Sequence, residues 1–412
     1  MQLTETGQAQ RFGTPFLVAF LVLLQMFTMF STDMYAPALP HMATEFNEPE
    51  SLVNMTVVAF FAFTIVGTLL LGPMSDKGGR RAILFVAISL FVAASAGCMA
   101  AGSVGALIIF RVFQALACGG IMSVTLAIVK DSFEGPSRVT VLMIIQAISV
   151  IGPIIAPVFG AQLLVWFSWR ATFAFLTLMG LAALGCALIF KESMPSSDRV
   201  AGSLWLSLRG LAGVARNGQF MVFMLVTAAF SAMPFNLYLT AAPFIYEGNF
   251  GLTPQQYSYF FGATAGLAIL GLVLYRFASR RITLALLTTI LIALGGLAGA
   301  GILLVGHTSP WAFFACMMVF QMLGTMVRPY SSNILLSLQP KDTGAASSML
   351  SCSVGLLGVA AMVPAVLIGG NYMISLGILM CLGSAISMAL WFFLWRSPAP
   401  LPGLRPQAPG KF

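Results

Sequence analysis

Twelve stretches of mostly apolar residues, separated by short polar loops, follow one another along the chain. A helix that crosses a bilayer needs about 20 such residues, so each stretch is predicted to be a membrane-spanning helix. The predicted spans are 16–38, 52–71, 82–101, 105–128, 139–163, 170–190, 218–241, 254–275, 282–303, 309–335, 344–367 and 371–395. Charged residues make up only 8% of the chain, against about 25% in an average soluble domain, which argues against a water-soluble fold. The sequence therefore predicts an all-α integral membrane protein.

The distribution of lysine and arginine predicts the orientation of the spans. An even number of spans places both termini on one side, and all but three of the 20 basic residues lie in the tails and loops of that side. Cytoplasmic loops carry an excess of these residues, so both termini are expected to be cytoplasmic. The exceptions are Arg170, in a loop of the opposite side, and Arg111 and Arg328, within spans. The net charge of +8 is thus explained by membrane topology, and no nucleic-acid partner is expected.

The longest loop, residues 191–217, divides the spans into two sets of six. Gly79-Arg80-Arg81 after the second span has a counterpart, Ser279-Arg280-Arg281, after the eighth, which indicates two related halves. The predicted domains are an N-terminal six-helix bundle (1–190), a cytoplasmic linker loop (191–217), a C-terminal six-helix bundle (218–396) and a cytoplasmic tail (397–412). Two pseudo-symmetric six-helix bundles resemble the plan of major facilitator transporters (the MFS fold), in which the substrate site lies between the halves.

The loop after the second span resembles the major facilitator signature Gly-x-x-x-Asp-x-x-Gly-Arg-Arg. In that family the loop locks the cytoplasmic face while the transporter is open outward. The resemblance implies a gating role for the matching residues and for the aspartate that ends the fourth span: Gly72, Asp76, Gly79, Arg80, Arg81 and Asp131. The alternative is an ordinary positively charged loop that reflects topology alone. The counterpart in the second half is degenerate, because Arg276 stands where the aspartate would fall.

The fourth and fifth spans carry two further patterns. Arg111-Val112-Phe113-Gln114 resembles a second motif of the family, Arg-x-x-Gln-Gly, with alanine in place of the glycine. In the fifth span, Gly152, Ala156 and Gly160 recur every four residues, so they line one helix face and let another helix approach closely. Pro153 and Pro157 remove backbone donors there and bend the helix. Such a face is explained by packing alone; alternatively, with the other motifs, it resembles the pattern of drug:H+ antiporters and implies a conformational role.

The end of the first span, Thr32-Asp33-Met34-Tyr35-Ala36-Pro37-Ala38-Leu39-Pro40, resembles the Thr-Asp-Met-Tyr-x-Pro-Ala-x-Pro signature of Bcr/CflA-type drug exporters. Trp169-Arg170-Ala171-Thr172-Phe173 fits the same group. The resemblance implies a twelve-helix drug:H+ antiporter of the bacterial cytoplasmic (inner) membrane. It implies multidrug efflux and antibiotic resistance, in which small lipophilic, neutral or monocationic compounds leave by alternating access. The proton gradient then supplies the energy and no cofactor is expected.

Asp33 is the only acidic residue within a predicted span. Counted along their helices, Asp33 and Arg111 both lie roughly 7–9 Å below the outer surface, so the two side chains are expected to pair. A low dielectric favours the protonated carboxyl group and a nearby guanidinium favours the ionised one, so small movements of such a pair load or release a proton. The pair is therefore predicted to couple protons to transport; the alternative is a static structural ion pair. The resemblance also implies a second carboxylate earlier in the first span, but this chain has Gln25 near that position, which argues against a scheme with two carboxylates.

Flexible methionine and aromatic side chains suit varied lipophilic ligands. The candidate substrate contacts are Gln25, Met29, Phe30, Tyr35, Gln114, Met233, Phe235, Asn236 and Tyr238, each with ordinary packing as the alternative. Arg328 is predicted two turns from the cytoplasmic end of the tenth span, where its side chain is expected to snorkel toward water.

The predicted function is proton-coupled export, with a dedicated metabolite or siderophore-type exporter or importer of the same superfamily as the alternative. An enzyme is not expected, because His41 and His307 lie far apart near external loops and no cluster of catalytic groups is evident. No metal site is expected either. The expected partners are small lipophilic substrates, protons and the lipid bilayer, and the chain is expected to act as a monomer.

Overall fold

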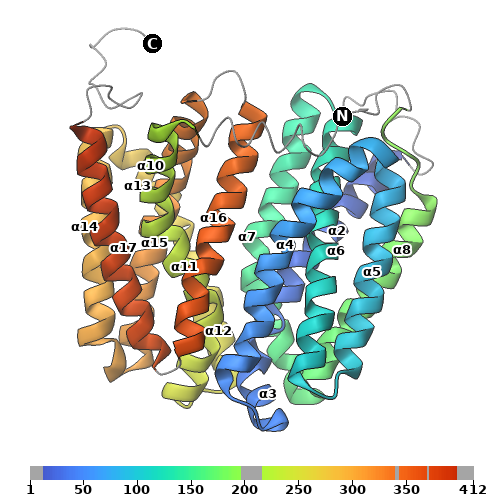
Figure 1. Cartoon of the computed structure of the whole chain (residues 1–412), viewed down its shortest axis with the longest axis horizontal. Coiled ribbons are helices and arrows are strands. Elements are labelled where there is room, and N and C mark those ends of the chain that lie inside the picture. Colours follow the sequence, from blue (N-terminus) through green and yellow to red (C-terminus); the bar gives the residue numbers. More distant parts are fainter. Residues whose placement is uncertain (1–12, 196–215, 339–342, 369–370, 397–412) are drawn as a thin grey trace. The chain divides into compact units, whose positions relative to one another are not determined.

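The computed structural model describes residues 13–195, 216–338, 343–368 and 371–396, and these residues are almost entirely helical (Figure 1). The predicted all-α membrane fold is confirmed, because each predicted span coincides with one helix or with a run of consecutive helices. The predicted linker loop falls mostly, and the predicted tail from residue 397 onward entirely, outside the described residues.

The first six spans are α2 (Gly13–Asp33) continued by η1 (Ala36–Ala38) and α3 (Leu39–Phe46), then α4 (Glu50–Gly78), α5 (Arg80–Ala100), α6 (Val104–Ser132), α7 (Gly135–Trp166) and α8 (Trp169–Ile189). The first continues to Phe46 and not to 38, and the second to Gly78 and not to 71 as predicted, so most of the predicted signature loop is helical. The first span breaks after Asp33 because Pro37 has no amide hydrogen to donate to the carbonyl four residues earlier. A single 3₁₀ turn follows before the helix resumes.

Two of the last six spans are interrupted, the seventh and the eighth. The seventh consists of α10 (Gly218–Thr227), η3 (Ala228–Ala232), α11 (Met233–Pro243) and η4 (Phe244–Asn249), and the eighth of α12 (Pro254–Ala268) and α13 (Leu270–Ala278). The remaining four are α14 (Leu284–Leu304), α15 (Pro310–Ser337), α16 (Thr343–Ile368) and α17 (Tyr372–Trp395). Both η3 and η4 are π-helical. Pro234 and Pro243 lie beside them and remove two helical donors, and π-helical turns often mark such interruptions.

Eleven helices in the described part of the chain are long and apolar enough to cross a membrane. The remaining predicted span, the eleventh along the chain, is α16, which has 26 residues. Its strongly apolar part is the shorter stretch Cys352–Val366. The seventh span runs to Asn249 and not to 241 as predicted, so Glu247 lies within its last helical turns.

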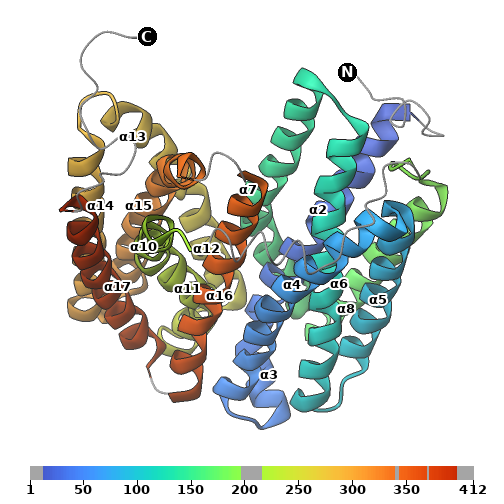
Figure 2. The same ribbon diagram turned by 45° about the horizontal axis from the view of Figure 1, so that its top comes forward.

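The chain divides into two compact units. The N-terminal unit contains residues 1–204 and 253–262, and the C-terminal unit contains residues 205–252 and 263–412. In the N-terminal unit, α4 and α6 lie side by side in both views (Figures 1 and 2). Their backbones approach closely at two glycines: a Cβ atom on Gly119 would lie 2.6 Å from the backbone nitrogen of Thr68, and one on Gly67 would overlap the backbone of Leu116.

Candidate functional site

The small-residue face of α7 packs against the first span, as its spacing predicts. Gly152, Ala156 and Gly160 are all buried. A Cβ atom on Gly152 would lie 2.9 Å from Cβ of Met29, and one on Gly160 would overlap the carbonyl oxygen of Met34. Both prolines of the predicted pattern, at 153 and 157, lie inside α7. The segment of the first span that ends in Asp33 is therefore held directly against α7.

Asp33 is the last residue of α2 and is buried, with only 8% of its surface exposed. The Thr32 hydroxyl lies 3.1 Å from Oδ1 of Asp33 and 3.0 Å from the carbonyl oxygen of Thr28. No lysine, arginine or histidine in the described part of the chain lies within ion-pair distance of this carboxyl group. Asp33 thus sits at a break in a spanning helix without a cationic partner.

Arg111 makes a different set of contacts from the predicted one. Its Nη1 donates to the carbonyl oxygen of Ser31 (2.8 Å) and to Oε1 of Gln114 (2.8 Å). The guanidinium carbon lies 4.1 Å from the ring centroid of Phe60 and 4.7 Å from that of Tyr35, so the charge rests on aromatic faces. The last carbonyl groups of a helix have no intrahelical donor, and the end of α2 therefore offers Ser31 as an acceptor.

The expected ion pair between Asp33 and Arg111 is not formed in this structure. Arg111 reaches the backbone of Ser31, and residues two apart on a helix point about 200° away from each other. Counting residues predicts the depth of a side chain in a span but not the direction in which it points. The Nε and Nη2 atoms of Arg111 are buried without a hydrogen-bond partner among the described residues.

Several substrate candidates in the N-terminal unit are engaged in contacts within that unit. The Tyr35 hydroxyl lies 2.9 Å from Oγ1 of Thr56, and Gln114 Nε2 donates to Oγ of Ser95 at 2.8 Å. Gln25 Nε2 donates to Oγ of Ser149 at 2.9 Å, which links α2 to α7. Phe30 stacks on Phe175 with ring centroids 5.9 Å apart, and Met29 contacts Gly152. Ordinary packing, the alternative to substrate contact for each of these residues, accounts for these interactions.

The signature loop forms a charged cluster around the buried Arg80. Nε of Arg80 donates to Oδ2 of Asp131 (2.9 Å), and Nη1 donates to Oγ of Ser75 (2.7 Å) and to the carboxylate of Asp76. Gly79 joins α4 to α5 with φ +90°, a backbone conformation that favours glycine. The cluster therefore ties together α4, α5 and α6, and the Cβ position of Gly72 is closed by Ser123 of α6.

Glu192 belongs to this cluster although no sequence pattern pointed to it. Its carboxylate accepts from the backbone nitrogens of Arg80 (2.9 Å) and Arg81 (3.2 Å), the first two residues of α5. Helix amino termini present unpaired N–H groups and favour negative charge, which explains the contact. Nη2 of Arg81 in turn donates to the carbonyl oxygen of Leu188 at the end of α8 (2.8 Å). Sequence reasoning missed Glu192 because it lies more than a hundred residues further along, in a loop without a motif.

A second unpredicted contact lies at the opposite end of the same bundle. Glu45, in the last turn of α3, accepts from Nη1 of Arg170 (2.5 Å) and from Nε1 of Trp169 (2.7 Å). The Arg170 guanidinium also lies 4.2 Å from the Trp169 ring centroid. These contacts hold the end of the first span against the start of α8.

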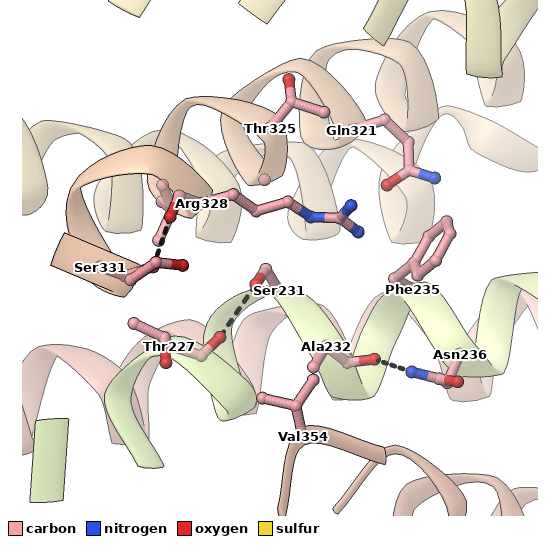
Figure 3. Close-up of a pocket in the computed structure, with 13 residues that line it drawn as sticks. Thr227, Ser231, Ala232, Phe235, Asn236, Gln321, Thr325, Arg328, Ser331 and Val354 are labelled. Carbon is pink, nitrogen blue, oxygen red and sulfur yellow. Dashed lines mark hydrogen bonds between the residues drawn. The ribbon is translucent and has the colours of Figure 1, made fainter. Parts of the chain in front are cut away.

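A cavity of about 330 Å³ opens within the C-terminal unit, between the seventh span, α15 and α16 (Figure 3). Two of the predicted substrate residues, Phe235 and Asn236, line this cavity. Of the other two candidates in this unit, Met233 does not line it, and Tyr238 is buried with its ring 6.4 Å from that of Phe313. The cavity contains residues that the sequence reasoning did not select, among them Gln321 and Ser231.

Arg328 lies in this cavity, and the expected snorkelling is not observed. Figure 3 shows its side chain extending along α15 toward Gln321 and Phe235, and its guanidinium carbon lies 5.8 Å from the Phe235 ring centroid. Long side chains on a helix point back toward its amino terminus. Arg328 lies nearer the carboxyl end of α15, so its side chain points away from that end. The helix also continues to Ser337, further beyond Arg328 than predicted.

The family model described as Major Facilitator Superfamily matches residues 21–362, which is most of the chain. This chain belongs to the major facilitator superfamily. It is therefore a transporter and not an enzyme, and the resemblance seen in the signature loop and in the second motif is confirmed at the level of the superfamily.

Curated relatives of this superfamily member include proteins named for drug resistance. The chain is 30% identical over 255 residues to a chloramphenicol resistance protein of Pseudomonas aeruginosa, covering 60% of this chain and 59% of the relative. It is 26% identical over 238 residues to the multidrug resistance protein MdtL of Shigella flexneri serotype 5b, covering 58% and 60%. An uncharacterised MFS-type transporter, YdgK of Bacillus subtilis, is 30% identical over 268 residues, covering 64% and 65%. The chain thus matches less than two thirds of the length of these relatives.

Solved structures of other transporters share the fold. A D-xylose–proton symporter superposes with a TM-score of 0.69 at 14% identity, covering 95% of this chain and 98% of that one. A mutant of the nucleoside transporter NupG superposes with a TM-score of 0.71 at 14% identity, covering 92% and 98%. At such low identity the likeness concerns the fold alone.

Proposed function

We propose that this chain is a proton-coupled exporter of small lipophilic compounds that works by alternating access. The observation that carries the proposal is the carboxyl group of Asp33, buried at the break of the first span without a cationic partner among the described residues. Ionisable groups inside a membrane are costly and mark proton or ion pathways. Because Asp33 has no ion pair to break, it can exchange a proton as soon as its surroundings change during the transport cycle.

Arg111 takes a supporting part in this proposal. Its guanidinium holds the carbonyl oxygen of Ser31, two residues before Asp33, and rests on the rings of Phe60 and Tyr35. Movement of the broken end of α2 would therefore also move a contact of a buried cation. We infer that Arg111 couples to Asp33 through the helix end and not through a direct ion pair.

The proposed substrate class rests on the names of the relatives. Two relatives carry names that refer to resistance against chloramphenicol or several drugs, which favours efflux of toxic compounds over uptake of nutrients. We propose multidrug efflux of neutral or monocationic compounds, with antibiotic resistance as its consequence. The energy source is the proton gradient, and no cofactor is required. The distribution of lysine and arginine supports both termini in the cytoplasm. We further propose that the chain acts as a monomer in the bacterial inner membrane.

A dedicated exporter or importer of one metabolite is the second candidate. The cavity of about 330 Å³ in the C-terminal unit lies at the small end of the range of ligand pockets, about 300–1,000 Å³. A small pocket with several amide and hydroxyl groups suits one polar ligand better than many apolar ones. The fold does not separate the two candidates, because sugar and nucleoside transporters share it.

A resistance profile tests the proposal. Cells that lack their own exporters and express this chain should tolerate several chemically unrelated lipophilic toxins, chloramphenicol among them, at concentrations about fourfold or more above those that stop control cells. The protection should disappear when a protonophore collapses the proton gradient. Cells that carry the Gly160→Leu variant provide the inactive control, because a side chain there would overlap the backbone of Met34. Protection against a single compound only would select the dedicated exporter.

A further inference from the structure

The cavity of the C-terminal unit contains a positive charge and, among the described residues that line it, no negative one. Arg328 is the cation, and the described lining residues include neither aspartate nor glutamate. No hydrogen bond or ion pair to the Arg328 guanidinium is formed within the described part of the chain; its one contact with an aromatic ring is Phe235. Arg328 is exposed to this cavity, so a ligand can reach its guanidinium and supply a partner there. Ionisable groups within membrane spans are costly and mark substrate or ion pathways.

The other polar groups of the cavity are mostly engaged with their own helices. The Ser231 hydroxyl donates to the carbonyl oxygen of Thr227 (2.9 Å), and the Thr227 hydroxyl donates to that of Met224 (2.9 Å). Asn236 Nδ2 donates to the carbonyl oxygen of Ala232 (2.8 Å). The donors that remain for a ligand are thus chiefly the guanidinium of Arg328 and the amide of Gln321, which face the same space in Figure 3.

The geometry of these groups favours a particular kind of ligand. A guanidinium presents a planar fork of N–H groups that matches the two oxygens of a carboxylate. The Phe235 ring beside it, 5.8 Å from the guanidinium carbon, offers a face on which a flat apolar group can stack. A ligand that carries a carboxylate next to an aromatic ring would therefore satisfy both features at once.

We propose that this cavity, the Arg328 cavity, binds the carboxylate of small aromatic acids, so that the exporter accepts lipophilic organic anions. The inference rests on the proposed transport function and extends it, because that function named only neutral and monocationic compounds as substrates. A monocation is disfavoured here, since it would approach the Arg328 guanidinium and the described lining offers no carboxylate to offset the repulsion.

Three fluorescent probes with the same ring system test this preference: dansylglycine is an anion, dansylamide is neutral and dansylcadaverine is a cation. Their binding is measured by fluorescence with purified protein in phosphatidylcholine nanodiscs, which contain no anionic lipid and carry no proton gradient. The wild-type protein should bind dansylglycine most tightly. Arg328→Gln should weaken dansylglycine binding at least about tenfold, because it removes a hydrogen bond to a charged group. The affinity for dansylamide should change by less than about twofold.

Two further variants control this experiment. Arg328→Lys keeps the positive charge but lacks the paired N–H donors of a guanidinium. Its affinity for dansylglycine should lie between those of the wild-type protein and Arg328→Gln. Arg280→Gln removes an exposed guanidinium between α13 and α14 and should change nothing. Unchanged dansylamide binding also shows that a variant is folded.

The proposal is overturned if wild-type protein binds dansylcadaverine as tightly as dansylglycine, or if Arg328→Gln weakens all three probes equally. Because binding is measured without a gradient, this inference can fail while proton-driven export stands. Conversely, loss of proton coupling in a transport assay would leave an observed anion preference intact.

Discussion

Replacing Asp33 with asparagine is expected to abolish uphill, proton-driven export while substrate binding survives. Asparagine has nearly the same size and keeps an oxygen that accepts from the Thr32 hydroxyl, but its side chain cannot take up or release a proton. Transport from a pH gradient in liposomes should therefore fall to the level of protein-free vesicles. Binding of the same substrate, measured without a gradient, should change by less than about threefold, since the cavity of the C-terminal unit is untouched.

Glu247→Gln is the matched control for this experiment. Glu247 carries another carboxyl group in a spanning segment, within the last helical turns of the seventh span. If Asp33 carries the proton, Glu247→Gln should retain uphill transport. Uphill transport by Asp33→Asn, or its loss in Glu247→Gln alone, would move the proton carrier away from the first span.

Replacing Arg80 with alanine is expected to destabilise the N-terminal unit strongly. The Arg80 side chain is 6% exposed and bonds Asp131 and Asp76, which are 16% and 44% exposed. Removing one partner of a buried ion pair leaves an uncompensated charge and typically costs about 3–5 kcal/mol. The purified variant should therefore unfold at a clearly lower temperature or denaturant concentration than the wild-type protein, whether or not the loop also gates transport.

Arg81→Ala separates this effect from a general loss of positive charge in the loop. Arg81 is exposed, and its guanidinium donates only to the Leu188 carbonyl oxygen, so the variant should lose less than about 1 kcal/mol. Equal destabilisation by Arg80→Ala and Arg81→Ala would show that the buried cluster contributes little. In that case the loop would be explained by topology alone.

The spans were predictable because a bilayer constrains a chain more strongly than water does. Backbone groups in the hydrocarbon must be bonded within the protein, so each apolar stretch of about 20 residues becomes one helix or a run of consecutive helices. The ninth span, for example, was predicted at 282–303 and is Leu284–Leu304. Close packing was also predictable where small residues repeat, as at Gly160, because only a missing side chain allows the backbones to meet.

The direction of side chains within the spans was not predictable in the same way. Arg111 was expected to meet Asp33 because the two lie at similar depth, yet it bonds the Ser31 carbonyl that the broken helix leaves open. Arg328 was expected to reach for water, yet it points along α15 into a cavity. Each outcome depends on rotation about a helix axis and on partners from distant segments, which no single stretch of sequence encodes.

The most direct test of proton-coupled export is the reversal potential of transport for a neutral substrate. Liposomes that contain the purified protein are loaded with a tenfold gradient of that substrate at equal pH, and the membrane potential is clamped with potassium and valinomycin. One proton exchanged per neutral molecule moves one charge, so net flux should vanish at about 59 mV. Two protons would place the reversal near roughly 30 mV and require a second carrier besides Asp33. If the gradient runs down at every potential, without a reversal, the transport is not coupled to protons and the proposed function is wrong.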